Sequence, residues 1–320
     1  MGQRNADRSA CGKNLEEEKE MELTGVHFLL SYRCTDECDH CFVWSSPKAR
    51  GTMTLAQIRD VLKQAKDLGT VEMVYFEGGE PFLFYPIMLQ GLREAAALGF
   101  KTGIVTNNFW ATSVEDAVEW LRPIAQAGID DLSLSSDLFH GEAMMTQAAS
   151  NAVEAATRLS LPEGVIAIEA PEGCAAYAPD DKGEPITGGP VRFRGRAVSK
   201  LTEGVPRQRW TEFTECPDED FRNPGRVHVD TFGHVHTCQG LLMGNLWEQP
   251  LKEMVASYDP VAHPIIGPLL EGGPVALAER YDLPHEDTYI DACHLCYQAR
   301  DQLRSRFPEF LAPATVYGEL

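Results

Sequence analysis

The sequence lacks a long hydrophobic run, and it lacks a surplus of basic residues. No stretch of about 18 apolar residues occurs, so we expect no transmembrane helix. The first 20 residues are polar and charged, and they contain no apolar segment of the kind found in secretory signals. The chain has 48 acidic residues but only 28 lysines and arginines, a net charge of −20. This charge disfavours nucleic acid and anionic membranes as partners, so we expect a cytoplasmic protein that binds neither.

The nine cysteines are the most informative feature of the composition. Because no secretory signal is expected, disulfides are not expected either, and closely spaced cysteines in a reducing compartment indicate metal ligands. Cys11 and Cys174 stand apart from the others. The remaining seven form an N-terminal set and a C-terminal set: Cys34, Cys38 and Cys41, then Cys216, Cys238, Cys293 and Cys296.

Strand-like and helix-like segments alternate between residues 25 and 200, which predicts βαβ units and a parallel sheet. The predicted strands cover residues 26–31, 71–76, 102–106, 131–135, 165–169 and 191–193. The predicted helices cover residues 54–68, 86–98, 113–127 and 142–161. Six units are too few for the usual closed eight-stranded barrel, and the pattern fits either an open partial barrel or a doubly wound sheet. In both folds the chemistry gathers at the C-terminal ends of the strands.

The character of the chain changes near residue 205. Residues 226–238 alternate like a hairpin with its turn at Phe232 and Gly233, and helices are predicted at 246–258 and 292–306. A Pro- and Gly-rich segment at 171–190 is predicted to be a loop. We therefore divide the chain into a flexible lead-in with a short helix at 15–22, a core, a small second unit and a tail: residues 1–22, 23–204, 205–311 and 312–320.

The N-terminal cysteines have C-x3-C-x2-C spacing directly after a predicted strand. Thiolates at this spacing suit zinc or an iron–sulfur cluster. A structural zinc site needs four ligands, so either His40 completes a zinc site or one metal position stays open for a substrate.

A second motif, Gly78-Gly79-Glu80-Pro81, ends the next predicted strand. Paired glycines allow the backbone to approach a ligand closely, and a carboxylate at a strand end suits an ammonium group. Taken by itself this motif also fits an ordinary turn.

Together the two motifs resemble the radical S-adenosylmethionine (radical SAM) superfamily. In that family three cysteines bind a [4Fe–4S] cluster, and SAM chelates the fourth iron. The resemblance implies cluster ligands at Cys34, Cys38 and Cys41, with the methionine part of SAM against Gly78, Gly79 and Glu80. The predicted fold class is then α/β, a partial (β/α)6 TIM-like barrel with a small C-terminal α+β auxiliary-cluster domain.

Further polar residues resemble family positions that contact the SAM carboxylate and ribose. These are Thr106, Asn107, Ser135 and Asp137, at the ends of the third and fourth strands. They also fit helix caps. Many members have an aromatic residue near the adenine, directly before the third cysteine, and this chain has His40 there. Arg192, Arg194 and Arg196 form a basic group that fits either a carboxylate-binding site or surface ion pairs.

The C-terminal cysteines provide four thiolates, a complete set for zinc or for a second [4Fe–4S] cluster. Cys216, the Gly233-x4-Cys238 hairpin and the Gly244-Asn245-Leu246 segment resemble SPASM and twitch domains, which hold auxiliary clusters. A full SPASM domain carries more cysteines, so the shorter twitch form with one auxiliary cluster is predicted.

The resemblance implies reductive cleavage of SAM to a 5′-deoxyadenosyl radical that removes a hydrogen atom from a substrate. It also implies a flavodoxin- or ferredoxin-type electron donor and a small-molecule or peptide substrate. An auxiliary cluster suits a net oxidation, as in an oxidoreductase, or a peptide modification. The alternative is a non-catalytic iron–sulfur or zinc protein. No catalytic acid or base is assigned from the sequence.

Overall fold

The computed structural model describes residues 21–141, 145–171 and 188–319. Cys11, most of the predicted helix at 15–22 and nearly all of the predicted lead-in lie outside this range, as do Cys174 and most of the predicted loop. Within the described residues, no helix combines the length and the apolar character needed to cross a bilayer.

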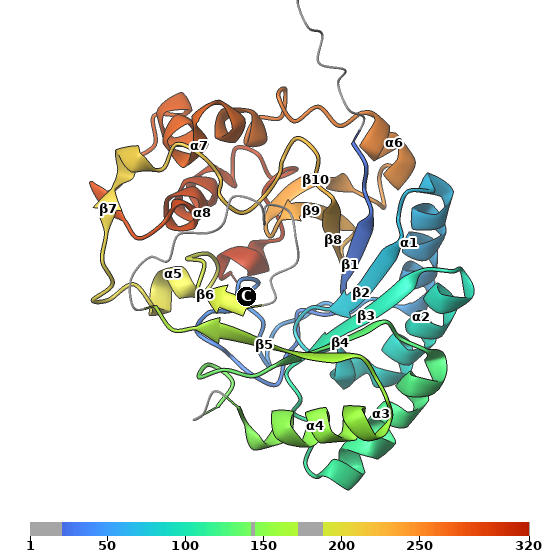
Figure 1. The fold of residues 1–320 in the computed structure, drawn as a ribbon. Helices are drawn as coiled ribbons and strands as arrows, with labels where there is room; N and C mark the ends of the chain where they lie inside the picture. The colour runs from blue at the N-terminus through green and yellow to red at the C-terminus, as the bar shows by residue number, and fades with distance from the viewer. Residues whose placement is uncertain (1–20, 142–144, 172–187, 320) are drawn as a thin grey trace, which may run out of the picture.

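One nine-stranded sheet, in the order β10-β9-β8-β1-β2-β3-β4-β5-β6, forms the centre of the molecule. Six strands from the N-terminal part run parallel in chain order: β1 (Gly25–Leu29), β2 (Met73–Glu77), β3 (Lys101–Thr106), β4 (Asp131–Ser135), β5 (Glu163–Glu169) and β6 (Gly188–Pro190). Four helices connect them: α1 (Leu55–Leu68), α2 (Tyr85–Ala97), α3 (Val114–Ala127) and α4 (Gln147–Arg158). Figure 1 shows the sheet curving, with these helices along its outer side. The predicted partial barrel is confirmed.

Local sequence signals explain where the helices begin and end. At α1, Thr54 and Gln57 form the predicted capping box, and Gly69 ends the helix with a left-handed φ of 88°. Ile58, Val61, Leu62 and Ala65 form its buried face. Ser113 caps α3 in the same way by accepting the Asp116 N–H.

The predicted hairpin is confirmed, but its place in the fold was not predicted. β8 (Arg226–Asp230) and β9 (His234–Cys238) are antiparallel, and β10 (Leu241–Asn245) continues the meander. β8 also pairs in parallel with β1 along its whole length, with His228 opposite His27. The hairpin therefore extends the core sheet, while β7 (Gln208–Arg209) and β11 (Thr288–Tyr289) of the C-terminal unit form a separate two-stranded sheet.

Several predicted boundaries were wrong. The sixth strand is Gly188–Pro190, not residues 191–193, because Gly188 to Pro190 pair with β5 while Val191 and Phe193 turn into a separate apolar cluster. α6 is confined to Leu251–Ala256, because β10 and the turn after it use residues 241–249 and Pro250 caps the helix. α4 begins at Gln147, since Thr146 caps it.

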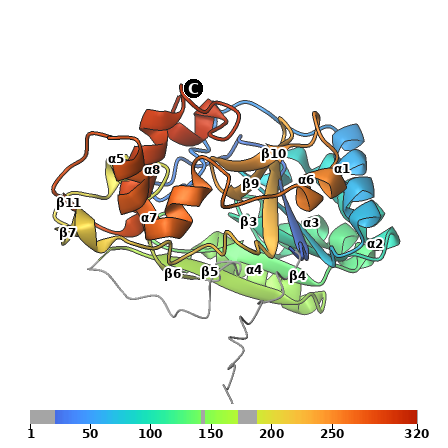
Figure 2. The same ribbon diagram turned by 90° about the horizontal axis from the view of Figure 1, so that it is seen from above.

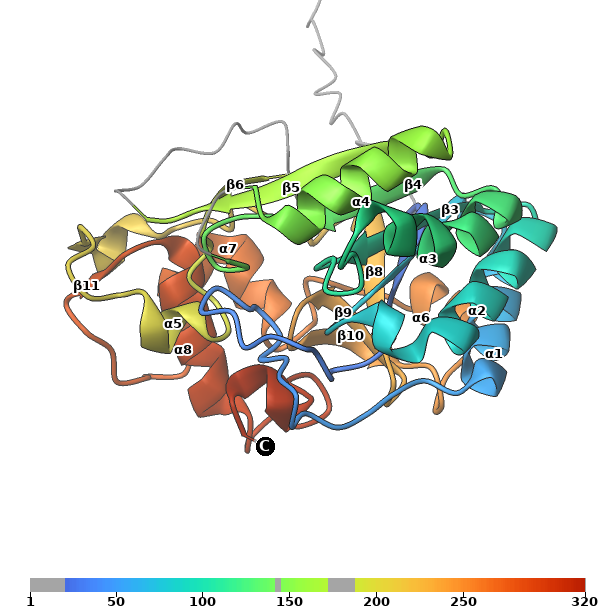
Figure 3. The ribbon, with the colours of Figure 1, turned by 90° about the horizontal axis from the view of Figure 1, so that it is seen from below.

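Figures 2 and 3 show α7 (Ile266–Arg280) and α8 (Ala292–Leu303) on the opposite side of the molecule from α1 and α2. The remaining short elements are η1 (Pro81–Phe84), α5 (Ala197–Lys200), η3 (Trp210–Glu212) and η4 (Ala314–Tyr317). Leu241, Ile265, Leu269, Leu277 and Leu303 form an apolar core around the C-terminal cysteines. This core fixes α7 and α8 against the hairpin.

Candidate functional site

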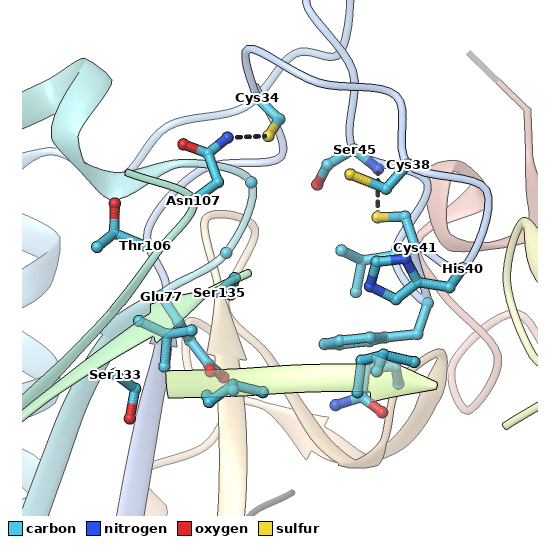
Figure 4. A pocket seen from close by; sticks show the side chains of 18 of the residues that line it. Cys34, Cys38, His40, Cys41, Ser45, Glu77, Thr106, Asn107, Ser133 and Ser135 are labelled. Atoms are coloured by element: carbon cyan, nitrogen blue, oxygen red, sulfur yellow. Dashed lines mark hydrogen bonds between the residues drawn. The ribbon is translucent and has the colours of Figure 1, made fainter. Parts of the chain in front are cut away.

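A cavity of about 290 Å³ lies on the inner side of the curved sheet. Each of the strands β1 to β6, together with β8, contributes at least one lining residue. Ten of the eleven residues expected to hold the first cluster and SAM line it: Cys34, Cys38, His40, Cys41, Gly78, Gly79, Thr106, Asn107, Ser135 and Asp137. Figure 4 shows the three cysteines on one side of this cavity and Glu77 with Ser133 on the other.

Hydrogen-bond donors point at two of the three sulfur atoms. The Ser45 N–H donates to Cys41 Sγ at 3.3 Å, and the Asn107 side-chain amide lies 3.6 Å from Cys34 Sγ (Figure 4). The same amide donates to Thr35 and Asp36, so it also fixes the start of the cysteine loop. Donors to sulfur stabilise the thiolate form that metals require.

Arg196 holds the cysteine loop in shape from the far side of the cavity. Its guanidinium donates to the Cys38 carbonyl at 2.7 Å and to the Ser45 carbonyl at 2.6 Å, while its backbone N–H donates to the Cys41 carbonyl at 2.9 Å. The side chain is 5% exposed and lies over the Trp44 ring. Of the two roles expected for the basic group, surface ion pairs are wrong for this residue, because it is buried and donates to carbonyls of the loop.

The chemistry of the N-terminal set fits a [4Fe–4S] cluster. Burial raises the pKa of Cys34 to about 12 and raises the pKa of Cys38 as well, so a cationic cluster would be needed to hold both as thiolates. Three thiolates leave one position of a cubane cluster open, whereas a closed zinc site would need a fourth ligand.

Gly78 and Gly79 lie where another part of the backbone passes closely. A Cβ at Gly79 would lie 2.1 Å from the Arg33 carbonyl oxygen, and one at Gly78 would lie 2.6 Å from the Ser31 carbonyl oxygen. The Gly79 N–H donates to that Ser31 oxygen at 2.6 Å. The glycines thus let the end of β2 pack against the segment that leads into the cysteine loop, and both still line the cavity.

Glu80 lies behind the cavity wall and is fully buried, and it is absent from the cavity lining. Its carboxylate accepts hydrogen bonds from the Phe82 N–H, the Thr106 hydroxyl and the Asn107 N–H at 2.8–2.9 Å. Burial raises the pKa of this carboxyl to about 7. The three hydrogen bonds favour the ionised form and lower the pKa, but their effect is smaller than that of burial. Its role toward the SAM ammonium group stays a prediction. The observed contacts tie the end of β2 to the end of β3.

We expect Glu80→Gln to destabilise the protein by about 2 kcal/mol, because the new amide would point a donor at a buried donor. Asn107 would lose its anchor, and SAM affinity would fall with it. Thermal unfolding and equilibrium SAM binding measure the two effects. Glu94→Gln, at an ion pair on the outer surface, is the control. Equal stability of the Glu80 and Glu94 variants would contradict this role.

Asp137, His40 and His140 lie together at the end of β4. Asp137 accepts the Phe139 N–H and bonds to His140 Nδ1 at 2.8 Å through one oxygen, and it accepts the Ile168 N–H through the other. His40 packs against Phe139, with ring centroids 4.6 Å apart. Burial lowers the pKa of His40 to about 4, and within the described residues its buried Nδ1 has no hydrogen-bond partner. The neutral His40 imidazole can therefore form a hydrogen bond through Nδ1 with the edge of a purine base.

We expect His40→Phe to keep the stacking surface and to weaken SAM binding by about tenfold, because one buried hydrogen bond is lost. Isothermal titration of the cluster-loaded protein with SAM measures this loss. An unchanged SAM affinity in His40→Phe would show that His40 contributes only packing and no hydrogen bond to SAM.

The C-terminal cysteines also converge. Cys216, Cys238, Cys293 and Cys296 line one small cavity together with Arg194 and Arg300. Both arginines are at most 3% exposed. Four thiolates around a cluster carry a net negative charge, which two buried guanidinium groups would offset. The set of four thiolates around one cavity fits a second cluster.

Arg194 lines both cavities. Its guanidinium donates to Cys238 Sγ at 3.1 Å, lies 3.5 Å from Glu219 and packs over the Phe42 ring next to Cys41. Gly195, with a φ of 61°, passes so close to the cysteine loop that a Cβ would lie 2.5 Å from the Cys41 carbonyl oxygen. The segment Arg194-Gly195-Arg196 therefore connects the two cysteine sets, a role that the sequence did not predict.

A polar group on the strands was also missed. We define the cavity floor as His27, Tyr75, Glu77, Asp131 and His228, which all line the cavity. The signal was present in the sequence: polar side chains at alternate positions of otherwise apolar strands, as in Asp131-Leu132-Ser133-Leu134-Ser135. Such alternation places polar groups on one face of a buried parallel strand.

Comparison with known proteins agrees with the geometry. The sequence model of the Radical SAM superfamily matches residues 28–158, from β1 to the end of α4. The chain is 26% identical over 129 residues to the "Putative peptide biosynthesis protein YydG" of Bacillus subtilis, covering 40% of each chain. It is 32% identical over 115 residues to the "PqqA peptide cyclase" of Streptomyces rochei, covering 35% of this chain and 29% of that one.

Among solved structures, "Native anSMEcpe with bound AdoMet" has a TM-score of 0.46 and 12% identity, covering 89% of this chain and 97% of that one. The chain spans well under half the length of the curated relatives that it matches.

Proposed function

We propose that residues 28–158, as a radical SAM domain, cleave SAM reductively. We propose further that the protein uses this cleavage to modify a peptide substrate. The observation that carries this is the convergence of Cys34, Cys38 and Cys41 with the β2 glycines and the polar ends of β3 and β4 on one cavity. A reduced [4Fe–4S] cluster on those cysteines would supply the electron that splits SAM into methionine and a 5′-deoxyadenosyl radical, which removes a hydrogen atom from the substrate.

The residues of the chain would bind and enclose the reactants. Asn107 and Ser45 orient the sulfur atoms, and Arg196 keeps the loop closed around them. His40 and Asp137 are placed to receive the adenosine part, while Gly78 and Gly79 leave room for the methionine part. The strands that wall the cavity limit the access of water, which protects a reactive radical from side reactions.

The names of two relatives support a peptide as the substrate class, since one is a putative peptide biosynthesis protein and the other a peptide cyclase. The net charge of −20 supports the proposal that neither nucleic acid nor a membrane is the partner. Within the proposal, residues 23–204 form the catalytic core and 205–311 carry an auxiliary [4Fe–4S] cluster. That cluster would accept one electron from the substrate radical, which makes the overall reaction an oxidation. A flavodoxin- or ferredoxin-type protein would supply the electron for SAM cleavage.

The test is SAM cleavage by anaerobically reconstituted protein with dithionite as the reductant. We expect 5′-deoxyadenosine and methionine in equal amounts from the wild type, and neither from Cys38→Ala. Deuterated candidate peptides then identify the substrate, because deuterium should appear in the 5′-deoxyadenosine. A protein that binds clusters but leaves SAM intact would be a non-catalytic iron–sulfur protein instead.

A further inference from the structure

We propose that His27, Glu77 and His228 form a divalent-metal site on the cavity floor, separate from the cysteines. His228 Nε2 lies 2.8 Å from Glu77 Oε1, and His27 Nδ1 lies 3.3 Å from the same oxygen. One ligand atom from each of the three residues lies within 4.8 Å of the other two. The three side chains thus converge on one point of the cavity, and none of them belongs to the residues expected to hold the cluster or SAM.

The sheet places these side chains on neighbouring strands. Glu77 is on β2, His27 on β1 and His228 on β8, and these strands are adjacent in that order. His27 and His228 are directly opposite each other in the parallel pairing. Because strand positions are fixed by the ladder of backbone hydrogen bonds, the three donors are held in place before any ligand arrives.

Two imidazoles and one carboxylate are a ligand set that binds first-row divalent ions and leaves positions open for a substrate. Ligands at right angles, each about 2.1 Å from an ion, lie about 3.0 Å apart. The distances of 2.8 and 3.3 Å bracket that value.

The protonation states suit a metal. Burial lowers the pKa of His228 to about 3, so its ring is neutral at pH 7 and has a lone pair to offer. Burial alone would raise the pKa of Glu77, but the two imidazoles outweigh this effect and hold it below its usual range.

Outer contacts orient the ligands, as in known metal sites. The Gln239 amide lies 3.4–3.5 Å from the His228 ring, and the Tyr75 ring stacks on His27 at 4.7 Å. Among the described residues, the two imidazoles are the hydrogen-bond partners of the Glu77 carboxylate, so its second oxygen is available to an ion.

Two other groups with similar composition are less suited. In the Asp230, His234 and His236 group, Asp230 already accepts bonds from the Tyr32 hydroxyl and from the Phe232 and His234 N–H groups. In the His40, Asp137 and His140 group, the carboxylate is bound to backbone N–H groups at both oxygens. Both carboxylates fix local backbone structure, whereas that of Glu77 does not.

An ion at this site would face the cavity and bind an oxygen donor of the substrate, such as a carboxylate, phosphate or carbonyl group. It would hold that group at the floor while the reacting carbon lies nearer the cysteines. The substrate class is therefore one with an oxygen ligand near the reacting atom.

Mn²⁺ is the probe, because it prefers oxygen and nitrogen ligands to the thiolates of the cluster sites. The cluster-loaded protein is treated with a chelating resin and titrated with Mn²⁺, and the free ion is followed by room-temperature EPR. We expect about one Mn²⁺ per wild-type chain, and at least about tenfold weaker binding in Glu77→Gln, His27→Gln and His228→Gln. His140→Gln and His234→Gln, from the other two groups, should bind as the wild type does.

The proposal is overturned if the wild type takes up no Mn²⁺, or if uptake survives in His228→Gln and disappears in His140→Gln. Iron content and thermal unfolding show whether each variant is folded. Since Mn²⁺ uptake needs neither SAM nor reductant, this result does not depend on whether the protein performs radical chemistry.

Discussion

Arg196→Gln is expected to lose the iron held by the N-terminal cysteines and with it all SAM cleavage. The guanidinium donates to two buried carbonyls of the cysteine loop, and no glutamine rotamer replaces both bonds. Charged hydrogen bonds contribute about 1.5–3 kcal/mol each, so the loop would lose on the order of 3–6 kcal/mol. Iron should fall from about eight to about four atoms per chain, while the C-terminal set keeps its cluster.

The matched control is Arg207→Gln. Arg207 is a partly exposed arginine paired with Glu286, and it contacts neither cysteine set. It should retain its iron and its SAM cleavage. Full iron occupancy in Arg196→Gln would show that the loop is held by the cluster itself and not by the arginine.

Arg194→Met is expected to destabilise the C-terminal unit and to lower the reduction potential of the auxiliary cluster. Removing the guanidinium would take away the donor to Cys238 Sγ and one of the two arginines that contact the buried Glu219, which would keep Arg226. Breaking a buried ion pair in this way costs about 3–5 kcal/mol. Loss of a positive charge beside a thiolate ligand also favours the oxidised cluster, so the midpoint should become more negative.

Arg194→Lys separates the two effects, because it keeps the charge but not the forked geometry. Its midpoint should stay close to that of the wild type, although its thermal stability should fall. Potentiometric titration followed by EPR measures the midpoint. A midpoint in Arg194→Met equal to that of the wild type would contradict electrostatic tuning by this residue.

The order of strands and helices followed from the sequence because each element carries a strong local signal. The capping box at Thr54 and Gly69 at the end of α1 are examples, as is the turn at Phe232 and Gly233. Ten of the predicted site residues reached one cavity because they follow parallel strands, whose ends meet at one edge of the sheet.

The contacts between distant segments did not follow from the sequence. Nothing local marks β8 as the neighbour of β1, since that pairing joins residues about 200 positions apart and depends on global closure of the sheet. Arg194 and Arg196 were predicted only as a basic group, because their partners are a thiol and backbone carbonyls, which carry no sequence signature. The placement of Glu80 behind the wall depends likewise on the path of residues 31–33.

The segment Arg194-Gly195-Arg196 links the two cysteine sets physically. Arg196 contacts the N-terminal set and Arg194 the C-terminal set, with Gly195 pressed against the loop between them. A change in the charge of a cluster on either cysteine set would therefore act on a segment that contacts both sets. Such a link is useful if electrons pass from the substrate radical to the auxiliary cluster.

The most direct test of the central claim is EPR of the reduced protein with and without SAM, for the wild type and for Cys34→Ala/Cys38→Ala/Cys41→Ala. We expect about eight irons in the wild type and about four in the triple variant. The wild-type signal should change its g-values when SAM is added, and the variant signal should not. Zinc in place of iron, or an iron signal that SAM leaves unchanged in the wild type, would contradict the account.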